Sequence, residues 1–375
     1  MKKSLIALAI ASAVSAPAFA ATANVDVYGR MAFSLDYADT NDLRGDGADA
    51  VTGRDNVSRF GIKGTEDLGN GLAAIWQVEM ALSANRDAGI STKGFTTTPS
   101  GTNIVTNVSF GGGMTLRNTF IGLSSKTMGT VILGRHDTPY KMSTGSLDIF
   151  SDTAGDYNTI IGTTASGTIF DNRAPQIVSY MSPTWTGFSF AVGYAESKLN
   201  EAAGADNAQS LSAMAKYVNG PIFGTVAYET FAGGTGGGSS TTLESEAFKA
   251  GLGVKLGAVQ LGAVYEMIDA DAARSANERD AYYMNAMYSI GAFDLKAAYG
   301  MSTNGDQATN LPSTEFDYYA VGADYNLSKR TKLFGLYTSL ANGNGTNLGQ
   351  STTGYKSAEA GNDVDVISLG VVHIF

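Results

Sequence analysis

Residues 364–375 of this 375-residue chain, VDVISLGVVHIF, decide the fold. Successive side chains of an extended strand point to opposite faces. One side of this strand therefore carries Ile367, Leu369, Val371, His373 and Phe375. The chain stops on an apolar ring followed by the terminal carboxylate, which suits a strand that ends at a membrane boundary. Bilayer hydrocarbon cannot hydrogen-bond backbone N–H and C=O groups, so such a strand must be paired on both edges. The segment predicts the last strand of a closed membrane barrel.

The other end of the chain predicts export. Lys2 and Lys3 precede an apolar stretch at residues 5–14, and Ala18, Phe19 and Ala20 form a small-x-small cleavage site. Residues 1–20 are therefore interpreted as a cleaved signal peptide, which leaves residues 21–375 as a single barrel domain. Two soluble domains are the alternative for this length, but there is no Pro-rich or charge-biased linker and no change of texture along the chain.

Composition narrows how the barrel is held together. No later segment contains the roughly 20 consecutive apolar residues of a transmembrane helix, so the membrane prediction depends on strands alone. The sequence has no Cys, which excludes a disulfide framework in an exported chain. A closed ladder of backbone hydrogen bonds, which leaves no free strand edge, is then expected to stabilise the fold.

Turn signals give the strand number. Seven short turns fall at residues 67–71, 126–129, 183–187, 218–221, 256–258, 290–292 and 328–331. Eight longer polar stretches fall near residues 39–55, 84–114, 136–172, 198–209, 233–243, 269–279, 302–315 and 342–363. These fifteen connections predict an all-β, 16-stranded antiparallel transmembrane β-barrel with short periplasmic turns and long outer loops. Barrels of about this size enclose an aqueous channel.

The alternation of residue types separates the two faces of the strands. In the first strand Val25, Val27 and Leu35 lie opposite Arg30 and Asp36. A soluble sandwich would bury the apolar face as its core, and it is the competing interpretation. Charges recur on the opposite face strand after strand, and 18 Tyr and 17 Phe tend to fall at segment ends as aromatic girdles do. These two features favour the membrane barrel.

Several motifs, in order along the chain, resemble strands of the trimeric general porins of Gram-negative bacteria. They are VDVYGR at 25–30, SRFGIKGTED at 58–67, RNTFIGL at 117–123 followed by Gly134 and Arg135, and SYMSP at 179–183 with Gly187 and Phe188. The terminal Phe375 matches as well. His373 departs from the family, where many relatives have an aromatic residue, and the third long loop matches only loosely.

The resemblance implies an outer-membrane porin, a water-filled channel for passive diffusion of ions and small hydrophilic solutes. It also implies that the third loop, residues 136–172, folds into the lumen and faces a basic wall. The wall residues carried over are Arg30, Arg59, Arg117 and Arg173, with Lys63 nearby. Alternation agrees, since Arg59 and Lys63 lie opposite Phe60 and Ile62, and Arg117 is expected opposite Leu116 and Phe120.

The acidic side of the constriction is expected from the third loop, which holds Asp148, Asp152 and Asp156. Connections longer than about 15 residues without structure of their own are usually functional. Opposed acidic and basic walls create a transverse field that favours small polar solutes.

Partners also follow from the resemblance. A homotrimer embedded in outer-membrane lipid and lipopolysaccharide is expected, and Phe375 is expected to be an assembly signal read by the barrel assembly machinery. No cofactor and no metal are expected. The acidic Asp42, Asp46 and Asp49, or Asp269 and Asp271, show no spacing that specifies a cation site.

Other functions are weaker interpretations. A sugar- or phosphate-specific channel would need a ladder of aromatic or Lys side chains, and only Lys216, Lys249, Lys255 and Lys296 are scattered candidates. An outer-membrane hydrolase would have to use His136 and Asp137. An estimated pI near 4.7 gives no support for nucleic-acid binding. The acidic total favours cations and the basic wall favours anions, so the ion preference stays open.

Overall fold

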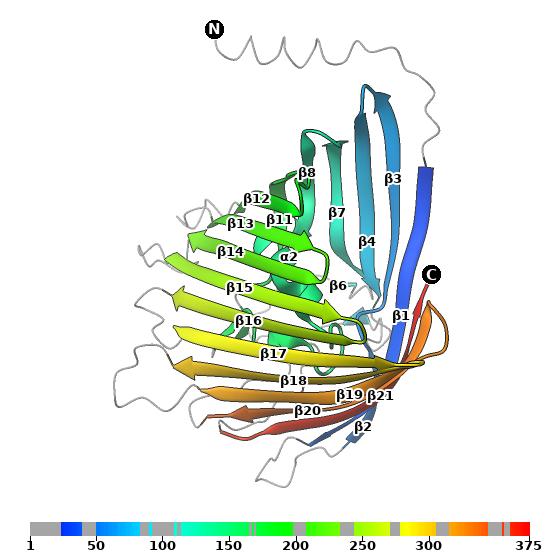
Figure 1. Ribbon diagram of the computed structural model, residues 1–375, viewed down its shortest axis with the longest axis vertical. Coiled ribbons are helices and arrows are strands. Elements are labelled where there is room, and N and C mark those ends of the chain that lie inside the picture. Colours follow the sequence, from blue (N-terminus) through cyan, green and yellow to red (C-terminus); the bar gives the residue numbers. More distant parts are fainter. Residues whose placement is uncertain are drawn as a thin grey trace, which may run out of the picture.

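The computed structural model of the chain describes residues 24–39, 50–82, 90–91, 109–110, 114–164, 167–168, 170–197, 208–232, 244–270, 278–304, 315–343, 355 and 361–375. Antiparallel strands form a wall around a short helix (Figure 1). The predicted signal peptide and Asp42, Asp46, Asp49 and Asp271 lie outside the described residues.

One sheet contains seventeen strand segments. They are β1 (Asn24–Asp39), β2 (Ala50–Asp55), β3 (Arg59–Gly69), β4 (Leu72–Leu82), β7 (Met114–Ser125), β8 (Gly129–Asp137), β11 (Arg173–Met181), β12 (Phe188–Ser197), β13 (Ala208–Asn219), β14 (Ile222–Ala232), β15 (Glu244–Leu256), β16 (Val259–Ala270), β17 (Arg279–Ile290), β18 (Phe293–Asn304), β19 (Phe316–Asn326), β20 (Thr331–Asn342) and β21 (Val364–Ile374). Because β2 and β3 both pair with β1, they are two parts of one wall strand. The barrel thus has sixteen strands, and the predicted fold is confirmed.

The remaining elements belong to the loops. Two small ribbons pair β5 (Ile90–Ser91) with β6 (Ser109–Phe110) and β9 (Thr163–Thr164) with β10 (Gly167–Thr168). The third loop contains helix α2 (Pro139–Thr144) and the 3₁₀ turns η1 (Gly145–Leu147) and η2 (Tyr157–Thr159). No helix in the described part of the chain is long and apolar enough to cross a membrane.

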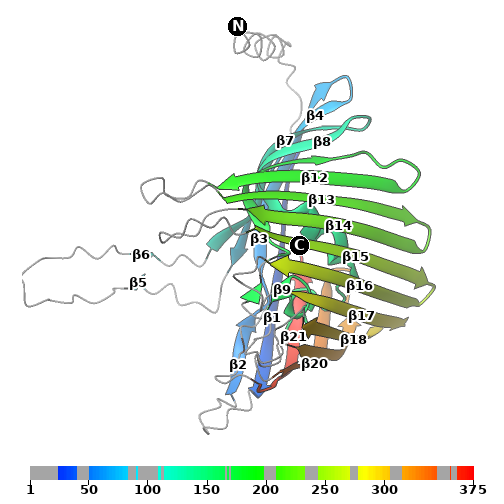
Figure 2. The ribbon, with the colours of Figure 1, turned by 90° about the vertical axis from the view of Figure 1, so that its left-hand side faces the viewer.

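The short turns lie where the sequence predicts them, and Figure 2 shows those that join β13 to β14 and β15 to β16 at one end of the barrel. Asn70 and Gly71 both have positive φ, 53° and 76°, which is the backbone of a type I′ hairpin turn. The first long loop is shorter than expected. Residues 50–55 form β2, whose mixed Thr and Arg content hides the strand pattern, and pair with β1.

The two faces of the wall are inverted relative to a soluble sandwich. Leu252 and Leu369 are 67% and 63% exposed on the outside, whereas Asp36 and Lys249 are fully buried on the inside. An outward apolar face around a polar interior needs lipid as its solvent. The predicted separation of faces in the first strand is confirmed, since Val25, Val27 and Leu35 are exposed.

Tyrosine–carboxylate pairs mark the outer end of the wall. Hydroxyls of Tyr265, Tyr299 and Tyr337 donate to Asp280, Asp317 and Asp365 over 2.7 to 2.8 Å. Each pair joins neighbouring strands near the long loops. An aromatic ring with a polar tip suits the boundary between hydrocarbon and head groups, so these pairs set the outer limit of the apolar band.

The barrel closes where β1 pairs with β21, from Arg30 opposite Ile374 to Asp39 opposite Asp365. The backbone then exchanges two further hydrogen bonds, Phe375 N to Gly29 O at 3.0 Å and Gly29 N to Phe375 O at 2.9 Å. A Cβ atom on Gly29 would lie 2.4 Å from the Phe375 ring. Gly29 therefore provides the space in which the last ring sits.

We predict that Gly29→Ala lowers the yield of folded barrel, because the added methyl group displaces the Phe375 ring from the closing pair of strands. The measurement is the fraction of heat-modifiable protein on gels after refolding into detergent. Gly224→Ala is the matched control, since the nearest atom to its Cβ would be at 3.7 Å. Equal yields for the two variants would contradict the assignment.

Candidate functional site

The third loop, between β8 and β11, folds inside the barrel (Figure 1). Its first helix, α2, has Pro139 at the first turn, and the Thr138 hydroxyl accepts a hydrogen bond from Lys141 N at 3.3 Å. Both features favour a helix start. Helix α2 packs against β13, β14 and β15, so the chain turns into the lumen as soon as β8 ends.

Apolar side chains fix the loop to one half of the wall. Phe150, Tyr157 and Ile160 are buried in a cluster with Tyr283 and Tyr318 of β17 and β19. The Tyr318 hydroxyl donates to the Gly155 carbonyl. The loop thus has its own apolar core against this half of an otherwise polar lumen.

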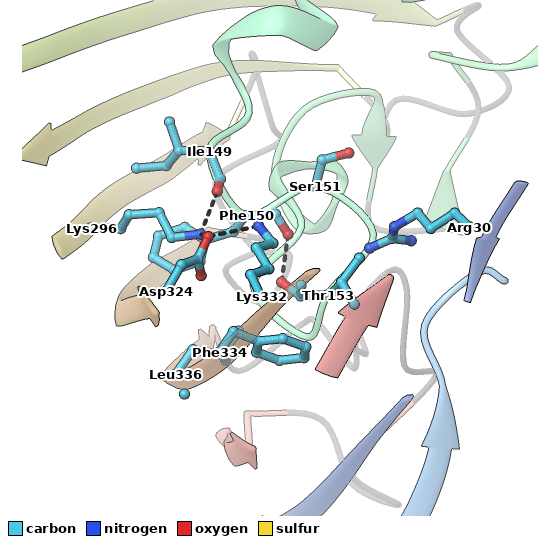
Figure 3. Close-up of a pocket in the computed structure, with 12 residues that line it drawn as sticks. Arg30, Ile149, Phe150, Ser151, Thr153, Lys296, Asp324, Lys332, Phe334 and Leu336 are labelled. Carbon is cyan, nitrogen blue, oxygen red and sulfur yellow. Dashed lines mark hydrogen bonds and ion pairs between the residues drawn. The ribbon is translucent and has the colours of Figure 1, made fainter. Parts of the chain in front are cut away.

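Polar wall side chains hold the loop backbone. Arg279 Nη2 donates to Ile160 O at 2.7 Å, Asn285 Nδ2 to Leu147 O at 2.7 Å, and Lys296 Nζ to Ile149 O at 3.0 Å. Figure 3 shows Lys296 between the Ile149 carbonyl and Asp324, behind the loop tip. Buried carbonyl groups need such donors, so these wall residues anchor the loop.

Two of the scattered lysines named from the sequence help to hold the third loop and its supporting wall. Lys249 pairs with Asp171 and lies 4.1 Å from the centre of the Tyr140 ring. Lys296 pairs with Asp324 at 2.9 Å. Neither side chain is free to form part of a ladder for a specific anion.

On the opposite side, Arg30 and Arg59 meet the loop tip. Asp152 Oδ2 accepts from Arg30 Nη1 at 3.1 Å and from Arg59 Nη1 at 2.9 Å. Val57, at φ 58° between β2 and β3, kinks the wall strand. The kink lets the preceding carbonyl, Asn56 O, accept from Arg30 Nη1 at 2.6 Å. A β-branched residue rarely adopts positive φ, and this strain serves the placement of Arg30.

A β-bulge in β7 places two more residues in the lumen. The pairing of β4 with β7 shifts between Val78 and Met80, so that Arg117 and Asn118 both face Glu79. Arg117 Nε donates to Glu79 Oε1 at 2.8 Å. Beyond the bulge the alternation reverses. Ile121 is the exposed residue there, so the expectation that Phe120 lies opposite Arg117 is wrong.

Arg173 completes this wall. Its Nη2 lies 2.8 Å from Asp137 Oδ1, and its Nε donates to Asn118 Oδ1 at 2.6 Å. Asn118 Nδ2 in turn donates to Asp137 Oδ2 at 2.9 Å. Each arginine of the expected basic wall therefore has a carboxylate partner.

The three expected loop acids play different structural parts. Only Asp152 pairs with the wall arginines. Asp148 accepts from Phe150 N at 2.9 Å and Tyr157 N at 3.3 Å. Asp156 accepts from Asp152 N at 2.9 Å and Asn158 N at 2.9 Å. Asp156 thereby fixes the backbone of Asp152.

A cavity of about 260 Å³ separates loop and wall. Its charged lining consists of Arg59, Arg117, Lys141 and Arg173 and of Asp137, Asp148, Asp152, Asp156 and Asp171. Arg30 contacts it through Asp152. Lys63 is not among the lining residues and lies 5.4 Å from the centre of the Tyr28 ring. In the described residues, no group of three or more His, Asp or Glu side chains could hold a metal ion.

Burial governs the protonation of the loop acids. It raises the pKa of Asp148 well above the usual 3.8, and the nearby charge of Asp156 adds to the effect. Burial also raises the pKa of Asp156. Burial opposes ionisation of Asp171 too, but the ammonium groups of Lys249 and Lys141 outweigh it and lower that pKa.

A sixteen-stranded barrel that is apolar outside and has a charged cavity across its lumen defines a channel-forming membrane barrel. The family model described as Gram-negative porin matches residues 7–347, and the chain belongs to this family. It is an outer-membrane porin of a Gram-negative bacterium and forms a channel for passive diffusion.

Relatives and solved structures agree. The chain is 30% identical over 369 residues to the major outer membrane protein P.IB of Neisseria meningitidis, covering 94% of this chain and 98% of the relative. An anion-selective porin from Comamonas acidovorans shares the fold with a TM-score of 0.74 at 23% identity, covering 94% of this chain and 100% of that one. The in-vitro folded trimer form of OmpT of Vibrio cholerae has a TM-score of 0.65 at 16% identity, covering 94% and 99%.

We predict that ion preference depends on pH through Asp148 and Asp156. Because their pKa values are raised, they gain charge only as pH rises above the usual range of about 4, and each lost proton adds negative charge beside the passage. The reversal potential in a salt gradient should move toward cations as pH rises above about 4.

The double variant Asp148→Asn with Asp156→Asn should lose the upper part of this titration. Asp269→Asn, whose side chain is exposed at the outer end of β16, is the control and should keep it. An unchanged titration in the double variant would contradict the prediction.

Proposed function

We propose that the passage lined by the Asp152 loop tip and the arginine wall is the constriction that selects ions in this general diffusion porin. The observation that carries the proposal is the single carboxylate of Asp152, shared by Arg30 and Arg59 across the cavity. Fixed charges of opposite sign on facing walls orient water and polar solutes and oppose apolar ones. Salt screens the interaction between charges over about 8 Å. Only charges at the narrowest section therefore act strongly on a passing ion.

We further propose a modest preference for anions. The side chains of Arg59, Arg117 and Arg173 keep 25%, 20% and 13% of their surface exposed, against 20% for Asp137 and for Asp152. Asp148 and Asp156 are bound to loop amides, and Asp171 is bound to Lys249. Three accessible cations thus face two accessible anions. The porin from Comamonas acidovorans that shares the fold is anion-selective, which supports the same sign.

A substrate-specific channel and a hydrolase fit the site less well. Lys249 and Lys296 anchor the loop instead of lining a path. His136 Nδ1 lies 2.8 Å from the Asp137 backbone carbonyl, while the Asp137 carboxylate is occupied by Arg173 and Asn118. We propose that this pair has no catalytic role and that the protein is not an enzyme.

The assembly proposed here is a homotrimer in outer-membrane lipid and lipopolysaccharide. On the outside, β1, β2, β20 and β21 form an apolar groove of about 630 Å³, lined by Phe33, Leu35, Leu333, Leu369 and Val371 around Gly53 and Gly370. A Cβ atom on Gly53 would have no neighbour within 4 Å, and this open space suits packing against another wall. We propose that a neighbouring copy packs in this groove. We also propose that the barrel assembly machinery recognises Phe375, and that residues 1–20 are removed on export.

We predict that Asp152→Asn shifts selectivity toward anions, because Arg30 and Arg59 lose their shared counter-charge. A unit charge at 4 Å in water is worth about 1 kcal/mol, so the permeability ratio should change by up to roughly fivefold. Reversal potentials in a salt gradient give this ratio. Asp317→Asn, on the outer face beside Tyr299, is the control. No difference between these variants would refute the constriction.

We predict that spin labels on Leu369→Cys are closer together in the assembled protein than labels on Leu252→Cys. Both positions are exposed outward, but only Leu369 lines the groove, and β15 is far around the barrel from β21. The chain has no other Cys. Pulsed electron resonance measures the distances. Equal distances at both positions, or no dipolar coupling in an assembly shown by mass to be trimeric, would place the interface elsewhere.

A further inference from the structure

We propose that Glu79 is a specificity-determining residue of the pore. It is an acid built into the basic wall that offsets the charge of Arg117, and it is held in place by Tyr28, which reaches it across Gly61. The inference rests on the proposed function, because it concerns the same constriction. It adds a second source of negative charge, on the wall itself, to the acids of the loop.

Three residues lie in one row across the wall. Tyr28 of β1 is directly opposite Gly61 of β3, and Gly61 is directly opposite Glu79 of β4. Directly opposed residues project to the same face of a sheet. Tyr28 OH nevertheless donates to Glu79 Oε2 at 3.0 Å. The side chain therefore spans the whole of the intervening strand.

Gly61 makes this crossing possible. A Cβ atom at position 61 would lie 2.4 Å from Tyr28 Cζ and 2.5 Å from its hydroxyl oxygen. Side-chain carbon atoms do not approach to such distances, so any other residue there would push the ring away. The glycine is explained by this contact and not by its backbone conformation, because it is in the middle of a regular strand.

Glu79 is then fixed from its other side. The bulge in β7 turns Arg117 toward it, and Arg117 Nε donates to Glu79 Oε1 at 2.8 Å. Each carboxylate oxygen thus has its own donor, Tyr28 for Oε2 and Arg117 for Oε1. With only 10% of its side-chain surface exposed, Glu79 has little freedom to turn into the lumen. A carboxylate bound in this way stays close to its arginine.

The consequence is an uneven basic wall. Arg59 has its counter-charge on Asp152 of the loop, 2.9 Å away, so an ion that passes beside this pair meets both signs. Arg117 has its counter-charge beside it, on its own wall, so an ion meets a weakened positive charge. Glu79 therefore reduces the anion preference of the pore, and Tyr28 and Gly61 act as positioning residues for it.

The first test is Glu79→Gln, measured by reversal potential and single-channel conductance in a salt gradient. The expected result is a shift toward anions of up to roughly fivefold in the permeability ratio, with unchanged heat modifiability. Glu66→Gln is the matched control, because Glu66 is exposed near the periplasmic end of β3, which runs from Arg59 to Gly69. That control should leave the ratio unchanged.

The second test removes no charge. Gly61→Ala should displace the Tyr28 ring, and Tyr28→Phe should keep the ring but delete its hydrogen bond. Both variants free Glu79, so both should change the permeability ratio in the wild-type background and change it no further in the Glu79→Gln background. Equal effects in both backgrounds would overturn the positioning role of Tyr28 and Gly61.

Arg117→Ser separates this inference from the proposed function. If Arg117→Ser shifts selectivity toward cations while Glu79→Gln has no effect, the role of Glu79 is refuted and the constriction stands. If both variants match wild type, the proposed constriction itself is refuted. If Glu79→Gln lowers the yield of folded barrel, Glu79→Asp, which keeps the charge, should restore both folding and selectivity. A Glu79→Asp variant that folds but does not regain wild-type selectivity would overturn the inference.

Discussion

The pairing of β1 with β21 is the constraint on which the other features depend. Once the first and last strands share a ladder, every wall strand has two neighbours and its backbone groups are satisfied without water. Stability then no longer depends on what points into the lumen, so Arg30, Asp36 and Lys249 can occupy inward positions that a soluble sandwich would fill with apolar residues. The fit of Phe375 over Gly29 completes this closure with a side-chain contact at the seam.

Inside the closed wall, the third loop separates an anchored side of the lumen, along β17 and β19, from the side that carries the arginine wall. Phe150, Tyr157 and Ile160 give the loop a dry core against β17 and β19, and wall donors such as Arg279 and Asn285 hold its carbonyl groups. The charged side chains on that side bind the loop backbone or one another. The other side remains open, and there Asp152 faces the arginine wall. The selective passage is thus a product of where the loop is fixed, since the anchored face determines which charges remain accessible to ions.

The sequence predicted the architecture well because barrel strands carry a local signal. Asn70 and Gly71 predict a hairpin turn. The alternation of apolar and polar residues from Val25 to Asp36 separates the outward and inward faces of the first strand. The arginines that the resemblance named, Arg30, Arg59, Arg117 and Arg173, belong to β1, β3, β7 and β11, and their assignment to a pore constriction stays a proposal. What alternation could not show was the bulge at Arg117 and Asn118, which reverses the faces at Phe120. Nor could it show that Lys249 and Lys296 hold the loop, or that Asp148 and Asp156 bind their own loop's amides, because these contacts join segments far apart in the chain or depend on loop conformation. The signal available for Glu79 was its inward position in a strand adjacent to that of Arg117.

The loop tip borders the narrowest part of the channel that we propose. This placement can be tested by the conductance of a Ser151→Cys variant before and after reaction with a bulky methanethiosulfonate, since Ser151 is exposed at the cavity and the chain has no Cys of its own. We expect a large stepwise loss of single-channel conductance on modification, and none for Leu252→Cys on the lipid-facing side. Unchanged conductance in a Ser151→Cys channel shown by mass to be fully modified would contradict it.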